Sequence, residues 1–187
     1  MIKPQASWLL AGLLALPFAA QAAQYAGIQA DKSSIAFGYK QMGVGMQGQF
    51  KKFSAKLDFD SAKPETAKAQ LEVDLASIDT GSAEGNQQVA AKAWFNTKSF
   101  PQARFVATSV KAQGPNRYLV SGQLTIKGRV RPVSAVATLT PQGKNAYFDG
   151  AFQIKRADFA IGEGDWADFG TVANEIQIKF HLLANAK

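Results

Sequence analysis

Apolar and polar residues alternate along most of the chain after residue 22, and this two-residue period is typical of strands with one buried face. In the clearest run, QLEVDL at 70–75, every second residue is Leu or Val and the residues between them are polar. Runs of the same kind occur at 35–39, 53–59, 118–126, 133–139, 148–154 and 176–182, with shorter and less regular strand candidates at 25–30 and 104–110. The pattern therefore predicts about eight strands.

Turn-forming residues separate these runs, so most connections between the predicted strands are short. The breaks lie at 63–64, 81, 114–116, 127–128, 141–143 and 162–164, and each contains Gly or Pro. Short connections favour neighbouring antiparallel strands, and a sheet with one apolar face per strand hides its edges when it closes on itself. The sequence therefore predicts an all-β fold, an eight-stranded antiparallel barrel, with a sandwich of two sheets as the alternative.

Residues 84–93 depart from the alternation. This segment is rich in Ala and Gln and precedes Trp94 and Phe95, which predicts a short helix or an irregular excursion across one end of the barrel. No repeat, low-complexity tract or Pro/Ser linker divides the rest of the chain, so residues 23–187 are predicted to form one barrel domain.

The first 22 residues follow a different pattern. Lys3 precedes an apolar run at 7–20, and the run ends in Ala20-Gln21-Ala22, a small-x-small cleavage signal. This order of charge, apolar core and small residues predicts a cleaved secretory signal peptide at 1–22. A membrane anchor is the alternative, but the run is short for ~30 Å of hydrocarbon and no second apolar segment follows it. The mature protein, residues 23–187, is therefore expected in the periplasm.

The composition narrows the range of partners. The chain has no cysteine, so neither a disulfide nor a thiolate contributes to the fold or to chemistry. The formal net charge is +7, falls to +6 without Lys3, and is spread thinly apart from KGRVR at 127–131. For an exported chain this balance argues against nucleic acid as a partner, and it is compatible with transient attraction to an anionic membrane surface.

Residues suited to catalysis or metal binding are scarce. His181 is the only histidine, and it shares the outward phase of its predicted strand with Gln177 and Lys179. GVGMQG at 43–48 matches a dinucleotide-binding motif in letters only, because it lies between two predicted strands and opens no helix. Neither segment therefore predicts a catalytic or nucleotide site.

Four carboxylates crowd the loop before the last predicted strand: Asp158, Glu163, Asp165 and Asp168. A pair of them could act in acid–base chemistry or bind a hard cation. The alternative is a solvated loop whose carboxylates cap turns and supply a counter-charge for Arg156. We prefer the second interpretation, so no catalytic or metal site is predicted, and the protein is not expected to be an enzyme.

The predicted inner faces combine large and small residues. Among the small ones, Ala55, Gly122, Ala135, Ala137 and Gly150 occur in the same alternating phases as Phe and Ile. An eight-stranded barrel is just wide enough to be filled by side chains or to hold one ligand. Small residues on neighbouring strands leave space for a ligand, but Phe from opposite strands would fill that space, and the sequence leaves both interpretations open.

Five stretches resemble, in order and spacing, the YceI-like family of exported lipocalin-like proteins. They are DKSSIAF at 31–37, GQFKKF at 48–53, WFNTKSFPQARF at 94–105, GQLTIKGRVRPV at 122–133 and IKRADFAIG at 154–162. No stretch is specific alone, but together they make the resemblance strong, and it covers residues 24–184.

The resemblance implies an eight-stranded antiparallel lipocalin-like barrel whose pore holds a polyisoprenoid chain or a similar long lipid, with isoprenoid quinones as natural candidates. Such a bound isoprenoid would be a ligand, and no cofactor is expected. The expected apolar lining comprises Phe37, Tyr39, Leu57, Leu71, Val73, Val120, Leu124, Ala135, Phe152 and Phe180. Three aromatic residues are expected at the mouth or in a lid: Trp94, Phe95 and Trp166.

The sequence departs from the family pattern at two places. Many members carry an Arg-Asp pair followed by His before the segment that begins at Trp94, where this chain has SAEGNQQ at 82–88. Members usually have Gly at the position of Ala160. The first change removes charged groups near one end of the pocket, which leaves the head group of the ligand open.

The functional prediction is a periplasmic carrier that holds a long isoprenoid or another lipid in the barrel interior. A non-catalytic stress or structural protein whose filled barrel binds another protein is the alternative. Pairing of two barrels as a homodimer is compatible with either function.

The export prediction has a direct test. If the signal peptide is cleaved after Ala22, protein isolated from a periplasmic fraction will begin at Ala23, and N-terminal sequencing will show it. Residues 1–22 retained on protein in an inner-membrane fraction would contradict the prediction.

Overall fold

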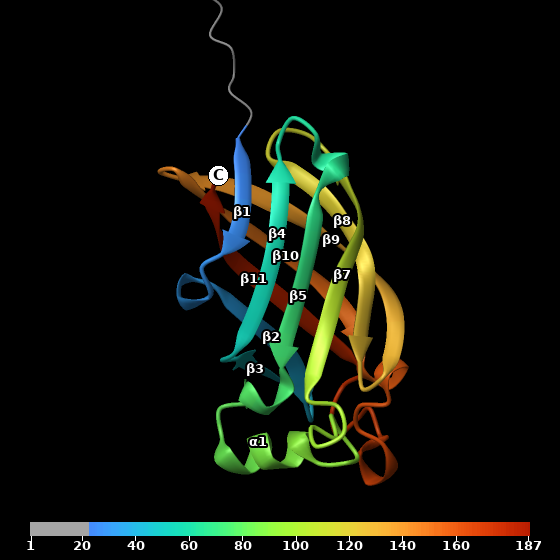
Figure 1. The fold of residues 1–187 in the computed structure, drawn as a ribbon. Helices are drawn as coiled ribbons and strands as arrows, with labels where there is room; N and C mark the ends of the chain where they lie inside the picture. The colour runs from blue at the N-terminus through green and yellow to red at the C-terminus, as the bar shows by residue number, and fades with distance from the viewer. Residues whose placement is uncertain (1–22) are drawn as a thin grey trace, which may run out of the picture.

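Eleven strand segments and one α-helix make up the computed structural model, which describes residues 23–187 (Figure 1). The elements are β1 (Gln24–Ile28), β2 (Ser34–Gln41), β3 (Val44–Phe50), β4 (Phe53–Asp60), β5 (Lys68–Asp74), β6 (Ile78–Asp79), α1 (Ala83–Ala90), β7 (Gln102–Ala112), β8 (Arg117–Ile126), β9 (Arg129–Gln142), β10 (Asn145–Lys155) and β11 (Glu175–Ala186). The predicted signal peptide, 1–22, lies outside the described residues. No helix in the described part of the chain is long and apolar enough to cross a membrane.

The strand segments follow eight paths around a barrel, because three of the paths are interrupted by a short bend. β1 with β2, β3 with β4, and β5 with β6 are the halves of the interrupted paths. Each path pairs antiparallel with the next in sequence, and β1 and β2 both pair with β11, which closes the ring. The predicted eight-stranded antiparallel barrel is therefore confirmed.

Three strands differ from their sequence predictions. Residues 43–48 were expected to lie between two strands, but 44–50 form β3, which pairs with β2 along its whole length. The strand expected at 104–110 is longer, because β7 includes four more residues and pairs with both β5 and β8. A register shift between Ala107 and Ser109 interrupts its alternation, as a β-bulge does, and this explains why the sequence pattern looked irregular. Pro141 was expected in a turn but pairs with Ala146 at the end of β9.

Helix α1 confirms the predicted excursion before Trp94 and lies across one end of the barrel (Figure 1). The connection between β10 and β11 lies at the same end, so we call it the helix end. The hydroxyl of Ser82 caps the helix by accepting a hydrogen bond from the backbone N–H of Gly85 at 3.0 Å. None of the eight helical residues is fully buried, so this short helix depends on its cap and on contacts with the rest of the chain.

The opposite end of the barrel is closed by four aromatic side chains, which we call the aromatic plug. They are Tyr25, Phe59, Tyr118 and Phe148, all buried. The ring of Phe59 lies 4.9 Å from that of Tyr118 and 5.2 Å from that of Phe148, in edge-to-face arrangements. Because such pairs add to the stability from apolar burial, the plug closes this end with packed side chains instead of a loop.

Phenylalanine rings lie over glycines on the inner wall. The rings of Phe37, Phe105 and Phe180 occupy the positions that side chains on Gly48, Gly122 and Gly150 would take. At Gly122 and Gly150, where the sequence left open whether space or Phe side chains would be found, a ring from a neighbouring strand covers each glycine. The same arrangement keeps these large rings against the wall.

Adding a methyl group at Gly122 should destabilise the barrel. An added Cβ would overlap both the Phe105 ring and the carbonyl oxygen of Val106, and such overpacking costs about 1–3 kcal/mol. We expect Gly122→Ala to lower the free energy of unfolding by about that amount in urea titrations. The control is Gly45→Ala, where nothing lies within 4 Å. Equal stability of the two variants would contradict the wall packing.

Candidate functional site

A large cavity lies inside the barrel. Its volume is about 910 Å³, near the upper end of the ~300–1,000 Å³ typical of small-molecule sites. Inward-facing residues from every strand path border it, and most of them are apolar. The sequence did not decide whether the barrel is filled or hollow, and the structure shows that it is hollow.

All ten residues expected to line the barrel border this cavity: Phe37, Tyr39, Leu57, Leu71, Val73, Val120, Leu124, Ala135, Phe152 and Phe180. Seven of them are only partly buried although they face inward, among them Leu71, Val120 and Phe152. In a filled core these side chains would be fully buried. Their partial exposure is therefore exposure to the empty space of the cavity. Contact of these residues with a ligand stays a prediction.

Polar side chains border the cavity mainly at the helix end. Gln41 and Gln47 come from the β2–β3 hairpin, and Thr80, Ser82, Glu84 and Gln88 come from the segment around α1. Trp94, Phe95 and Trp166, the residues expected at the mouth or lid, border the cavity at this same end. The cavity is thus apolar toward the aromatic plug and polar toward the helix end.

Sequence reasoning missed the contribution of residues 80–88 to the cavity. Alternation marks the inner face of a strand, but these residues lie in a turn and a helix, where the period is different. The departure from the family pattern at 82–88 was the one feature of the sequence that could have indicated this contribution to the cavity.

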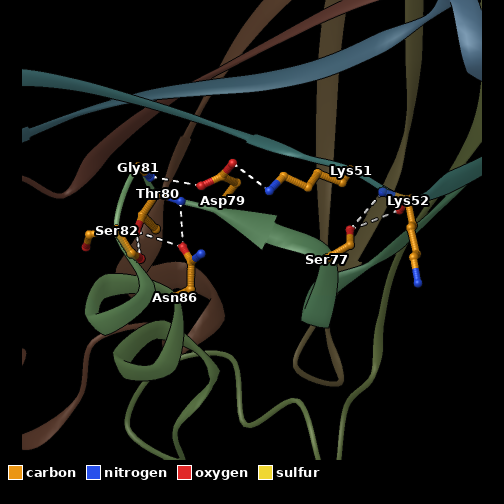
Figure 2. Close-up of polar contacts among 8 residues, drawn as sticks. All are labelled: Lys51, Lys52, Ser77, Asp79, Thr80, Gly81, Ser82 and Asn86. Carbon is orange, nitrogen blue, oxygen red and sulfur yellow. Dashed lines mark hydrogen bonds and ion pairs between the residues drawn. The ribbon is translucent and has the colours of Figure 1, made fainter.

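Hydrogen bonds fasten α1 to the bend between β3 and β4 (Figure 2). Asn86 Oδ1 accepts from the backbone N–H and the hydroxyl of Thr80 at 2.7 and 2.8 Å. Asp79 accepts from Lys51 at 2.8 Å and from the backbone N–H of Gly81 at 3.1 Å. These two hydrogen bonds hold the pKa of Asp79 below its ordinary value.

Ser77 makes the second attachment of this segment. Its hydroxyl accepts from the backbone N–H of Lys52 at 2.9 Å, while its carbonyl accepts from that of Lys51 at 3.1 Å. The two lysines stand at the bend, where the strand ladder is interrupted, so Ser77 satisfies backbone groups that would otherwise lack partners. The segment that carries α1 is therefore held to the barrel on both sides of β6.

Arg156 organises the opposite side of the helix end. Its side chain is 1% exposed, and its guanidinium donates to backbone carbonyls of the β10–β11 connection. The shortest of these bonds reach Trp166 at 2.7 Å and Ile161, Gly162 and Val172 at 2.9 Å. One side chain thus joins both halves of the connection.

The loop carboxylates are exposed, as expected of a solvated loop, but none of them pairs directly with Arg156. Arg156 has no carboxylate within 4.0 Å among residues 23–187, and Asp158, Glu163, Asp165 and Asp168 are all exposed. Burial lowers the pKa of Arg156, and the charge of Asp168 opposes this shift. Asp168 thus acts as a counter-charge from a distance and caps a turn by accepting from the backbone N–H of Gly170, while the direct partners of Arg156 are backbone carbonyls, which the sequence pattern does not encode. Arg156 does share the inward phase of Phe152 and Ile154, and that phase was the available signal.

Lys127 connects a third segment to the helix end. Its ammonium group donates to the carbonyl oxygen of Ala160 at 2.7 Å, to that of Lys92 at 3.1 Å and to Glu163 at 2.8 Å. The hydrogen bond from Lys127 lowers the pKa of Glu163. The β8–β9 turn, the chain before Trp94 and the β10–β11 connection are therefore tied together at one point.

Groups suited to acid–base or metal chemistry are not gathered at the cavity. In the described range, 23–187, no group of three or more His, Asp or Glu side chains is arranged to hold a metal ion. His181 lies on the outer surface of β11, as its phase predicted, where it pairs with Asp149 and stacks on Tyr147 at 4.1 Å. The chemistry that the cavity itself offers is apolar contact, with polar groups at one end.

Comparison with known proteins agrees with this architecture. A family model described as YceI-like domain matches residues 27–184. The chain belongs to the YceI-like family. The resemblance drawn from the five sequence stretches is thereby confirmed.

Relatives and solved structures with similar sequences or folds agree with this assignment. A UPF0312 protein of Photorhabdus laumondii is 33% identical over 95% of each chain. The crystal structure of Burkholderia cenocepacia BcnA is 45% identical, covers 84% of this chain and 99% of its own, and superposes with a TM-score of 0.82. A polyisoprenoid binding domain from Saccharophagus degradans shares the fold, with a TM-score of 0.65 at 18% identity over 89% of this chain and 99% of its own.

The family departure at Ala160 has a structural explanation. Ala160 is in the left-handed conformation, with φ of 53°, and ends the 3₁₀ helix Arg156–Phe159. Glycine, the residue expected here from the family resemblance, adopts this conformation without the steric cost of a Cβ atom, roughly 1–2 kcal/mol. The bond from Lys127 to the Ala160 carbonyl helps to hold the strained residue in place.

Replacing Arg156 should loosen the whole β10–β11 connection. A lysine carries three donors on one nitrogen, whereas the three nitrogens of Arg156 donate to six backbone carbonyls. Arg156→Lys therefore leaves buried acceptors unpaired, and we expect a loss of about 3 kcal/mol or more in thermal or urea unfolding. Arg129→Lys, at an exposed position, is the matched control and should stay within about 0.5 kcal/mol. If Arg156→Lys were as stable as the control, the carbonyl contacts would not be what holds the connection.

Proposed function

We propose that this protein is an exported, non-catalytic carrier that holds a long isoprenoid, such as an isoprenoid quinone, or another lipid in its barrel. The observation that carries the proposal is the hollow interior, about 910 Å³ in volume and lined mainly by apolar side chains. It is blind at the aromatic plug and polar at the helix end. A tube of this kind suits a molecule with a long apolar tail and a polar head.

The size of the cavity suits such a tail. Its volume equals that of roughly thirty water molecules at ~30 Å³ each, and a methylene group takes up a similar volume. Burying a methylene contributes about 0.8 kcal/mol, so about twenty buried carbons contribute on the order of 16 kcal/mol. Association and ordering cost about 4–15 kcal/mol. Apolar contact alone can therefore hold a chain of this length.

The asymmetry of the cavity suggests how the ligand lies. The tail would extend toward the aromatic plug, because that part of the wall is apolar. The head would lie near Thr80, Ser82 and Gln88, where polar side chains border the cavity. The Saccharophagus domain, a polyisoprenoid binding domain with the same fold, supports the view that a barrel of this kind can enclose such a chain.

The competing function, a filled barrel that binds another protein, has less support. A filled interior would bury the inward residues, whereas Leu57, Leu71 and Phe180 keep part of their surface beside the cavity. Native mass spectrometry of the purified protein, followed by organic extraction, separates the two functions. A co-purifying lipid supports the carrier, and an unliganded mass together with a captured protein partner supports the alternative.

Export and membrane exchange complete the proposal. The signal peptide at 1–22 would place the carrier in the periplasm, where a lipid must cross water between membranes. The positive balance of the remaining chain, +6, would favour transient contact with anionic lipid surfaces during loading and release. Pairing of two barrels is not required by this function.

Blocking the tube should expel the ligand without unfolding the barrel. Ala135 borders the cavity on β9, so we expect Ala135→Trp to fill the tube and to reduce extractable lipid several-fold while the far-ultraviolet circular dichroism stays barrel-like. In a filled core the same change would be overpacking, which costs about 1–3 kcal/mol, with no ligand to release.

Thr138→Trp is the matched control for this experiment. Thr138 lies on the same strand with the opposite phase and is exposed, so a new indole there points away from the tube. The control should keep its full complement of lipid. Equal lipid content in the two variants would show that the tube is not where the ligand lies.

A further inference from the structure

The indole of Trp94 carries a buried hydrogen-bond donor without a partner. Trp94 is 7% exposed and borders the cavity. Its Nε1–H has no acceptor in the described part of the protein. A buried donor left unpaired is unusual, because native structures satisfy the great majority of such groups. This orphan therefore requires an explanation beyond apolar packing.

The surroundings of Trp94 favour a partner with negative charge density. The guanidinium carbon of Arg156 lies 5.7 Å from the centre of the Trp94 ring. Each nitrogen of that guanidinium already donates to a backbone carbonyl, and no carboxylate in residues 23–187 forms an ion pair with it. A buried cation that is fully engaged and a buried N–H donor that is unpaired therefore lie side by side at this end of the cavity.

We propose that Trp94 Nε1–H donates a hydrogen bond to an acceptor oxygen on an uncharged head group of the lipid, such as the carbonyl of a quinone. The inference rests on the proposed carrier function and specifies the chemistry of its ligand. The tail then runs from Trp94 toward the aromatic plug. The orphan donor becomes satisfied only in the loaded protein.

The number of charged donors at the cavity favours a carbonyl head group over a diphosphate. A diphosphate carries several negative charges and is normally held by several charged or backbone donors. The cations that border the cavity are Lys56 and Arg156. Lys56 is on the outward phase of β4, and Arg156 has no nitrogen left without an acceptor. Glu84, on α1, adds a negative charge at the same end, so an uncharged acceptor fits better than an anion.

Trp166 packs against Trp94 at the helix end. The two indoles pack edge to face, with ring centres 5.4 Å apart and planes inclined at 61°. Nε1 of Trp94 is enclosed by neighbouring atoms, so an incoming oxygen reaches it only after a neighbour moves. Trp166 is partly exposed and is carried by the short 3₁₀ helix Gly164–Trp166, which makes it the side chain that can make room.

Two probes with and without oxygen test the proposal in the delipidated mature protein. Menaquinone-4 supplies carbonyl oxygens on an isoprenoid tail, and squalene supplies an isoprenoid chain without any oxygen. We expect Trp94→Phe to weaken menaquinone-4 binding by about three- to ten-fold, the effect of one neutral hydrogen bond. Squalene binding should stay within about two-fold of the wild type, because phenylalanine keeps an apolar ring in the wall.

A second measurement does not depend on the variant folding. Trp94 and Trp166 are the only indoles in residues 23–187, so the indole N–H region of a ¹H–¹⁵N spectrum contains two signals. Menaquinone-4 should move the Trp94 signal downfield, as hydrogen bonding does, and squalene should not. Trp166→Phe assigns the remaining signal and should change affinity for both probes to the same degree.

Each outcome has a distinct meaning. Equal losses for menaquinone-4 and squalene in Trp94→Phe, or no loss for either, would overturn the inference and leave the carrier function standing. Tighter binding of geranylgeranyl diphosphate than of menaquinone-4 would overturn the uncharged head group. If the wild-type protein bound none of the three probes, the carrier function itself would fail, and the inference with it.

Discussion

Hydrogen bonding of β1 and β2 to β11 closes the sheet, and the other features of this protein depend on that closure. An open sheet must cover its edges and bury its apolar face by packing against something else. Here each strand path is hydrogen-bonded to a neighbour on both sides, so backbone hydrogen bonds between strands stabilise the whole wall of the barrel. The interior is consequently free to remain hollow, and three Phe–Gly contacts keep bulky rings against the wall instead of across the tube.

The two ends of the barrel are closed by different physical means, and this difference gives the cavity its direction. At the aromatic plug, buried rings pack against one another. At the helix end, polar and charged side chains hold irregular backbone. Arg156 and Lys127 donate to carbonyls of the β10–β11 connection, and Asn86 and Asp79 fasten the segment around α1. Polar groups are therefore concentrated at the end where a ligand's head would lie, while the apolar wall continues to the plug.

Buried polar groups at the helix end serve two separate purposes. Arg156 is fully engaged with backbone carbonyls, and its role is structural. Trp94, beside it, has a donor that nothing in the described protein satisfies. Local violations of hydrogen-bond satisfaction tend to occur at functional sites, where a ligand completes the arrangement. Of these two neighbouring residues, Arg156 therefore has a structural role, and Trp94 is the candidate for ligand binding.

Alternation in the sequence determined most of the strands, the face that their residues occupy and the ten positions expected on the inner wall, because a period of two assigns faces without reference to neighbours. It could not determine whether that wall encloses empty space, since this depends on which side chains meet across the barrel. Phe105 and Gly122, or Phe180 and Gly150, come together only through strand register and closure. The carbonyls around Arg156 and the unpaired donor of Trp94 depend on the path of loop backbone. Loops have no repeating sequence pattern from which such contacts could be predicted, so only the tertiary structure determined them.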